Sequence, residues 1–151
     1  MRILALDLAT KTGWAVSDGP SGVETFAVRR GESPGMRFVR FRAWCGKVCE
    51  TWRPGLVVYE QAHHRGGAPT EVAIGLVTSV QEICAERGIE HTSIHTSKIK
   101  QHATGKGNAN KEAMVTAAEA RWPSLTIIDD NHADALWLLD LAETTFTQGG
   151  P

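Results

Sequence analysis

Three acidic residues stand at the edges of apolar segments, which is an unusual place for a carboxylate. Asp7 lies in the run ILALDLA, Glu60 follows LVVY, and Asp134 belongs to the segment ADALWLLDLA. An unpaired buried carboxylate is costly, so a cation, a hydrogen-bond network or a shifted pKa normally compensates it. If the three segments converge, their carboxylates provide the oxygen ligands that Mg²⁺ prefers, and two such ions about 4 Å apart promote phosphodiester hydrolysis. Taken alone, Asp7 could equally cap its strand or pair with an arginine.

Hydrophobic periodicity predicts the elements that must position these acids. Short apolar runs indicate five strands, and apolar spacings of three and four indicate four helices. Three leading strands followed by alternating helices and strands indicate one α/β or α+β domain over residues 1–151, with a mixed sheet. The predicted strands cover residues 3–8, 14–16, 23–30, 55–61 and 89–95, and the predicted helices cover about 34–53, 70–87, 110–122 and a last segment from about 131.

The composition is that of an ordinary globular domain. Of the 151 residues, 42% are hydrophobic and 22% are charged, and the net charge is −1, so any surface for nucleic acid has to be local. The three cysteines lack the spacing of a disulfide framework, which favours a reducing compartment. Neither a signal peptide nor a membrane span is recognisable. We therefore expect a cytoplasmic protein with no membrane partner.

The order of the acidic segments resembles a known nuclease family. ILALDLATKTGWAV, then LVVYEQ with a glycine-containing loop and a long helix, then NHADALWLLDLA are similar to the RuvC group of Holliday junction resolvases, in the RNase H-like superfamily. The resemblance covers almost the whole chain. It implies an RNase H-like fold with a mixed five-stranded sheet, three antiparallel strands and then parallel strands, flanked by helices. The short chain suggests a phage-type member.

The resemblance also implies a site and an activity. Asp7, Glu60 and Asp134 match the family's acidic ligands, which would hold two Mg²⁺ or Mn²⁺ ions. A homodimer would then resolve four-way or branched DNA by paired symmetric nicks that leave 5′-phosphate and 3′-hydroxyl ends. Lys111 and Lys100 fall on the family's two lysine positions, in SKIKQHATGKGNANKEAM. A positioned ammonium would stabilise the charge that develops on the scissile phosphate, with Lys111 as the first choice and Lys100 as the second.

One position departs from the family pattern. The family usually places a fourth ligand three residues before the last aspartate, and here that position is Asn131. Asp130, at i−4, lies on the same helix face and could supply the missing carboxylate, whereas His132 should point elsewhere. An amide oxygen carries no charge, so Asn131 as ligand would weaken the second ion. Simple capping of the helix by Asp129, Asp130 and Asn131 is compatible with either choice.

Other polar residues could contact DNA near this site. His63 and His64 follow Glu60 closely enough to lie at its rim. A second basic group, opposed only by Glu32, could hold phosphates of a junction arm or simply keep a helix hydrated. That group consists of Arg29, Arg30, Arg37, Arg40, Arg42 and Lys47.

Two other functions remain open on the sequence alone. The same fold could cut branched DNA in general or the RNA of RNA–DNA hybrids, because preference for a junction depends on dimer geometry and groove shape. Alternatively, Asn131 could mark a decayed site in a catalytically silent junction-binding protein, which would bind without cutting in any divalent metal.

Overall fold

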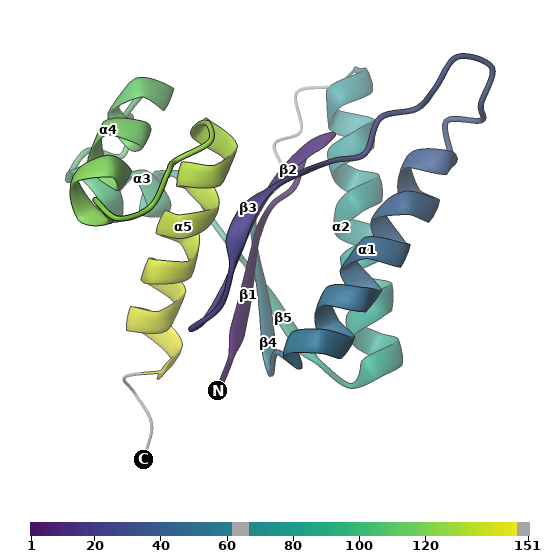
Figure 1. Ribbon diagram of the computed structural model, residues 1–151, viewed down its shortest axis with the longest axis horizontal. Helices are drawn as coiled ribbons and strands as arrows, with labels where there is room; N and C mark the ends of the chain where they lie inside the picture. Colours follow the sequence, from purple (N-terminus) through teal and green to yellow (C-terminus); the bar gives the residue numbers. More distant parts are fainter. Residues whose placement is uncertain (62–66, 148–151) are drawn as a thin grey trace.

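A single mixed sheet forms the centre of the molecule (Figure 1). The computed structural model describes residues 1–61 and 67–147. Five strands lie in the order β3-β2-β1-β4-β5. β1 pairs antiparallel with β2, and β2 with β3, whereas the β1–β4 and β4–β5 pairs are parallel, as predicted. The strands are β1 (Ile3–Asp7), β2 (Lys11–Val16), β3 (Ser21–Thr25), β4 (Leu56–Glu60) and β5 (Glu90–Ile94).

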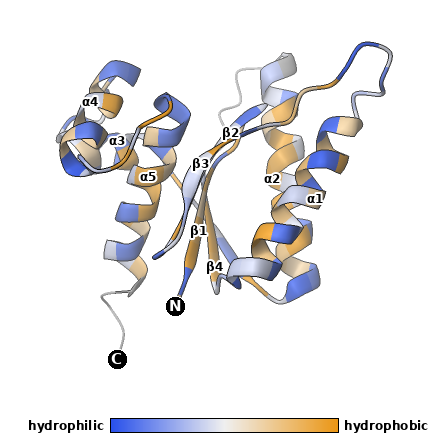
Figure 2. Cartoon of the chain, viewed as in Figure 1, coloured by the Kyte–Doolittle hydropathy of each residue, from blue (hydrophilic) through white to orange (hydrophobic). Residues whose placement is uncertain are grey.

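Helices cover both faces of this sheet. On one face lie α1 (Met36–Trp52) and α2 (Ala68–Arg87). The opposite face carries α5 (Asp130–Ala142) with α3 (Thr96–Thr104), α4 (Lys111–Arg121) and the short π-helix η1 (Glu143–Thr147). Each layer encloses its own apolar cluster, and Figure 2 shows apolar residues on the helix sides that face the sheet. Within the described ranges, the helices are too short or too polar to cross a bilayer.

The helical periodicity correctly identifies the buried faces. On α1, Phe41, Cys45 and Val48 recur at spacings of four and three and are buried. In α5, the inward positions predicted from the same spacing are Ala135, Leu138, Leu139 and Ala142, and all four are buried. Burial of these stripes, rather than intrinsic helix propensity, stabilises both helices against the sheet.

The third strand is shorter than the sequence predicts. It ends at Thr25 instead of residue 30. Arg37 donates from Nε to the carbonyl of Phe26 at 3.0 Å, and Arg40 donates to the carbonyl of Ala27 at 3.0 Å. Guanidinium groups of α1 thus satisfy backbone acceptors that a longer strand would have paired, and the chain leaves the sheet.

Two further elements differ from prediction. β2 begins at Lys11 rather than at residue 14, because Thr12 closes a tight turn by donating from its hydroxyl to the carbonyl of Ala9 at 2.6 Å. The lysine-bearing segment after β5 forms helix α3, for which no helix was predicted. Ile99 is its only buried residue, and most of the nine residues of α3 are polar, so few apolar positions mark the segment as a helix.

Candidate metal centre

Two of the predicted acids lie side by side because their strands are parallel neighbours. Asp7 is the last residue of β1, and Glu60 is the last residue of β4. In the register of this pair, Leu6 stands opposite Tyr59, so the next residue on each strand is the acid. Neighbouring parallel strands end at the same edge of a sheet, where polar side chains leave the core and meet solvent. Asp7 therefore ends its strand rather than interrupting it.

Helix α5 brings the third acid to the same edge. Asp134 lies one turn into α5, which packs across β1 and β2. The approach is close because β2 carries Gly13 at the crossing, where an added Cβ would lie 1.9 Å from the backbone oxygen of Asn131. Any side chain at Gly13 would push the beginning of α5, and Asp134 with it, away from the sheet.

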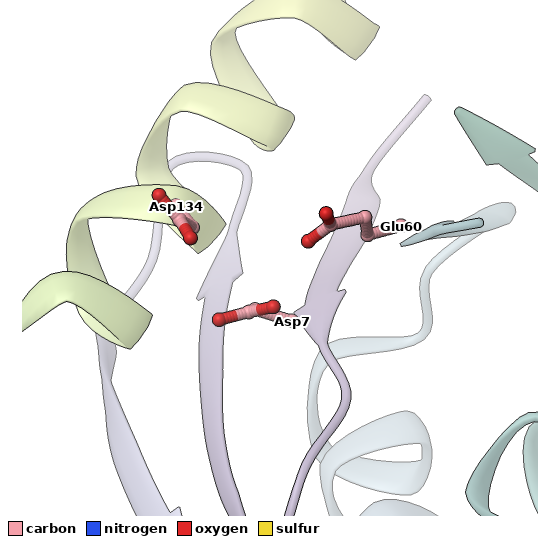
Figure 3. A group of neighbouring side chains, drawn as sticks. All are labelled: Asp7, Glu60 and Asp134. Atoms are coloured by element: carbon pink, nitrogen blue, oxygen red, sulfur yellow. The ribbon is translucent and has the colours of Figure 1, made fainter. Parts of the chain in front are cut away.

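The three carboxylates form one cluster, drawn in Figure 3. One oxygen each of Asp7, Glu60 and Asp134 lies within 4.8 Å of the others, and each residue is partly exposed. Figure 3 shows the three side chains pointing toward a common space between the strand ends and α5. This set, called the carboxylate cluster below, confirms that the three predicted acids converge.

Electrostatics within the carboxylate cluster oppose full ionisation. Burial raises the pKa of Asp7 well above its ordinary value, and the charges of Asp134 and Glu60 raise it further. Burial, together with the charges of Glu60 and Asp130, raises the pKa of Asp134 to about 7. Like charges this close disfavour each other unless a cation intervenes. The donor set is all oxygen, which suits hard divalent cations, so the cluster can hold metal ions of that class.

A residue that the sequence analysis missed supports Glu60. The hydroxyl of Thr96, the first residue of α3, donates a short hydrogen bond to Oε1 of Glu60. β5 is the parallel neighbour of β4, so the residues that follow it reach the same edge. The signal that could have identified Thr96 is its place just after a predicted strand beside β4. Its hydrogen bond fixes the orientation of the Glu60 carboxylate.

The polar residues at the beginning of α5 have different roles. Asp129 caps the helix by accepting from the backbone N–H of His132 at 2.9 Å, and it pairs with Lys11 at 3.0 Å. The neighbouring Asn131 side chain acts to lower the pKa of Asp129. Asp130 lies outside the carboxylate cluster, but its charge raises the pKa values of both Asp7 and Asp134. Capping is thus the role of Asp129, and the identity of a fourth ligand stays a prediction.

His132 points away from the carboxylate cluster, as its helical position predicts. Its ring is buried, accepts from the backbone N–H of Ile128 at 3.1 Å through Nδ1, and lies 2.8 Å from the hydroxyl of Ser21 through Nε2. Since Nδ1 accepts, Nε2 carries the proton and donates to Ser21. Burial lowers the pKa of His132, which keeps the ring neutral in this structural role.

Both predicted lysines lie on the side of the carboxylate cluster formed by α3 and α4. Lys100 belongs to α3, and Lys111 is the first residue of α4. Their positive charges act to lower the pKa of Asp134, against the stronger opposing effect of burial. Nζ of Lys111 lies 3.8 Å from Asp130, and the Lys111 side chain is 84% exposed. An exposed ammonium beside the cluster is available to an anionic substrate.

The second basic group is less positive than the sequence suggests. Arg40 pairs with Glu32, but Arg42 also has acidic partners, Glu82 at 3.2 Å and Glu86 at 3.1 Å. Glu32 is therefore not the only opposing acid, because packing of α2 beside α1 supplies two more. The predicted rim residues His63 and His64 lie outside the described residues.

Comparisons with known proteins identify the fold. No protein-family model matches the sequence, and no curated protein matches it. Thermus thermophilus RuvC in complex with a Holliday junction substrate is similar with a TM-score of 0.79 and 21% identity, over 98% of this chain and 95% of that one. A second Thermus thermophilus RuvC structure gives 0.76 and 21%, over 98% and 96%. The yeast mitochondrial Holliday junction resolvase gives 0.62 and 12%, over 91% and 75%. The chain has the RuvC fold of the RNase H-like type.

Proposed function

We propose that this protein is a metal-dependent endonuclease that resolves four-way DNA junctions. The observation that carries the proposal is the convergence of Asp7, Glu60 and Asp134 at one edge of a RuvC-like sheet. One solved protein with this fold is described in complex with a Holliday junction substrate, and another is a Holliday junction resolvase. The likeness to these proteins supports four-way DNA as the substrate, and the carboxylate cluster supports metal-dependent hydrolysis.

The carboxylate cluster would hold two Mg²⁺ or Mn²⁺ ions. When bound, such ions activate water and stabilise the leaving 3′-oxygen, which gives 5′-phosphate and 3′-hydroxyl ends. Asp7 and Glu60 offer ligands from two rigid strand ends, and Asp134 offers one from a helix fixed by its close contact with Gly13. Thr96 keeps the Glu60 carboxylate oriented. Ligands on regular elements are held more firmly than ligands on loops.

Lys111 and Lys100 would stabilise the phosphate that is cut. Both charges act on Asp134, so they are close enough to influence an anion at the carboxylate cluster. A phosphodiester undergoing attack gains negative charge, and a fixed ammonium lowers the free energy of that state more than the free energy of the bound substrate.

The protein would act as a homodimer on four-way DNA. Two coordinated nicks in strands of the same junction require two sites, and a two-fold axis relates two such sites most simply. The proposed partners are therefore a second copy of the chain and a junction whose arms have the same approximate symmetry.

The proposed function is tested by incubating the purified protein with three labelled substrates. These are an immobile four-way junction, a matched duplex and an RNA–DNA hybrid, each with Mg²⁺, with Mn²⁺ and with a chelator. The expected result is a pair of symmetric nicks in the junction that require metal and leave ligatable ends. Cutting of the hybrid or of all branched DNA would move the protein to a broader nuclease class. Tight junction binding with no cut in either metal would instead indicate a silent junction binder.

A further inference from the structure

A pocket of about 450 Å³ lies where the segment after β1 meets α1, α2 and the beginning of α5. Its lining includes the apolar residues Leu8 and Val72 and the polar residues Lys11, Arg37 and Asn131. The volume lies within the range of about 300–1,000 Å³ that is usual for small-molecule sites. We refer to this cavity as the Arg37 pocket.

The Arg37 pocket is adjacent to the acids in the chain and lies opposite the lysines. Leu8 directly follows Asp7, and Asn131 precedes Asp134 by one helical turn. Arg37 and Val72 belong to α1 and α2, on one face of the sheet, whereas Lys100 and Lys111 belong to helices on the other face. Cations therefore flank the carboxylate cluster from both faces of the sheet.

Arg37 carries the excess positive charge of this pocket. Its Nε donates to the carbonyl of Phe26 at 3.0 Å, which orients the guanidinium group. No acidic side chain in the described ranges forms an ion pair with it, in contrast to Arg40 and Arg42 on the same helix. Lys11, by comparison, is already paired with Asp129 at 3.0 Å.

We propose that the Arg37 pocket binds a phosphate of the DNA strand that the carboxylate cluster cuts, at a nucleotide flanking the scissile position. This inference rests on the proposed endonuclease function. Arg37 would donate to the phosphate oxygens through its terminal N–H groups, and the apolar lining residues Leu8 and Val72 would contact the attached sugar. The cut strand would then run from the lysines of α3 and α4, across the carboxylates, to α1. Such contacts fix the register of a strand without reading its sequence.

The test compares Arg37→Gln with Arg42→Gln, a matched change in a paired arginine of the same helix. Single-turnover cutting of the junction at increasing protein concentration separates the half-saturating concentration from the maximal rate. For Arg37→Gln we expect the half-saturating concentration to rise about tenfold, with the maximal rate within about twofold of the unmodified protein. The slope of the logarithm of the binding constant against the logarithm of the salt concentration should become shallower by about 0.7–0.9, which corresponds to the loss of one phosphate contact. Arg42→Gln should match the unmodified protein, and Arg37→Lys should recover part of the loss.

Chemical neutralisation of the DNA locates the contact. Junctions carrying one methylphosphonate at each of the three phosphates on either side of the cut should reveal one position where neutralisation weakens binding of the unmodified protein. At that position Arg37→Gln should suffer no additional loss. Melting temperatures of the variants confirm that each is folded.

The outcomes separate this inference from the proposed function. If the unmodified protein cuts the junction but Arg37→Gln and Arg42→Gln have equal half-saturating concentrations, the phosphate contact is wrong and the endonuclease stands. The same conclusion follows if each methylphosphonate weakens junction binding by Arg37→Gln as much as it weakens binding by the unmodified protein. If the unmodified protein neither binds nor cuts the junction, both proposals fail.

Discussion

Charged residues are arranged in opposite ways in two regions of this molecule. On the outer surface of α1 and α2, Arg42 lies 3.2 Å from Glu82 and 3.1 Å from Glu86. At the edge of the sheet, three carboxylates gather with their oxygens within 4.8 Å of one another. The first arrangement resembles the solvated ion pairs of any protein surface, each of which contributes little to stability. The second opposes folding in the absence of a cation.

The contrast shows where the fold brings together charges that repel one another. A paired surface needs no further explanation, because each charge has its partner. A cluster of like charges persists only if protonation or a bound cation compensates it, and such conflicts are typical of functional sites. The carboxylate cluster is therefore the part of the molecule that a metal and a phosphate substrate would complete.

Asp7→Asn removes one of the three carboxylates of the carboxylate cluster and should have the largest effect. We expect single-turnover cleavage of a junction to fall by at least about a thousandfold, because loss of metal-based charge stabilisation amounts to several kcal/mol. Junction binding, measured by fluorescence anisotropy, should be retained or improved because one negative charge is lost. Full cleavage activity in this variant would remove the metal-site model.

Without metal, the stability of the fold should fall as the pH rises, and Asp134→Asn should lessen this fall. The pKa of Asp134 is raised from its ordinary value of 3.8 to about 7 in the folded protein. Between these values the folded state holds a proton that the unfolded chain has released, so the free energy of unfolding decreases with rising pH. In chelator at pH 8, Asp134→Asn should melt roughly 3–8 °C above the unmodified protein, and at pH 4 the difference should vanish.

Calorimetry across this pH range checks the result, with and without Mg²⁺. Mg²⁺ should raise the melting temperature of the unmodified protein at pH 8 and should have little effect on Asp134→Asn. A variant that melts at or below the unmodified protein in chelator at pH 8 would show that the carboxylates do not repel one another.

Lys111→Ala tests whether a cation beside the carboxylate cluster acts on the reaction. We expect the maximal single-turnover rate at saturating protein to fall about 10- to 100-fold, as for the loss of one charged hydrogen-bond donor. Lys106→Ala, an exposed lysine of the same segment, is the matched control and should leave the rate unchanged. An effect confined to junction affinity would instead make Lys111 a residue that positions a phosphate.

Asp130→Ala and Asn131→Ala distinguish the candidates for a fourth ligand, and their effects should be the smallest. The charge of Asp130 acts on both Asp7 and Asp134, whereas the Asn131 amide carries no charge. We expect Asp130→Ala to raise the Mg²⁺ concentration required for half-maximal cleavage about 3- to 10-fold and Asn131→Ala to change it less than twofold. The reverse order would identify Asn131 as the ligand, and no change in either variant would exclude both.

The sequence predicts the core of the site because its signals are local. Asp7 and Glu60 each end an apolar run, and parallel neighbouring strands necessarily bring such ends together. Asp134 stands in the opening turn of the predicted last helix, and the resemblance to the RuvC group matches it to one of the family's acidic positions. The order of the elements makes convergence of the three acids possible, and the resemblance to a nuclease family turns that possibility into an expectation.

The rest depends on contacts between distant segments. The ion pairs of Arg42 with Glu82 and Glu86 form only because α2 packs beside α1, and nothing near Arg42 in the sequence indicates them. Likewise, Thr96 supports Glu60 across 36 positions in the chain. Helix α3 was not predicted because it is short and mostly polar, and Ile99 is its single buried residue. Tertiary packing therefore determines which charged residues form ion pairs with one another.

The most direct test of the carboxylate cluster is anomalous diffraction from crystals grown with Mn²⁺. The proposed function predicts anomalous peaks between the side chains of Asp7, Glu60 and Asp134, at about 2.1 Å from their oxygens. The same peaks should be absent from crystals of Asp7→Asn. Manganese bound elsewhere, or a cluster whose carboxylates stay metal-free at saturating Mn²⁺, would contradict a metal-dependent nuclease.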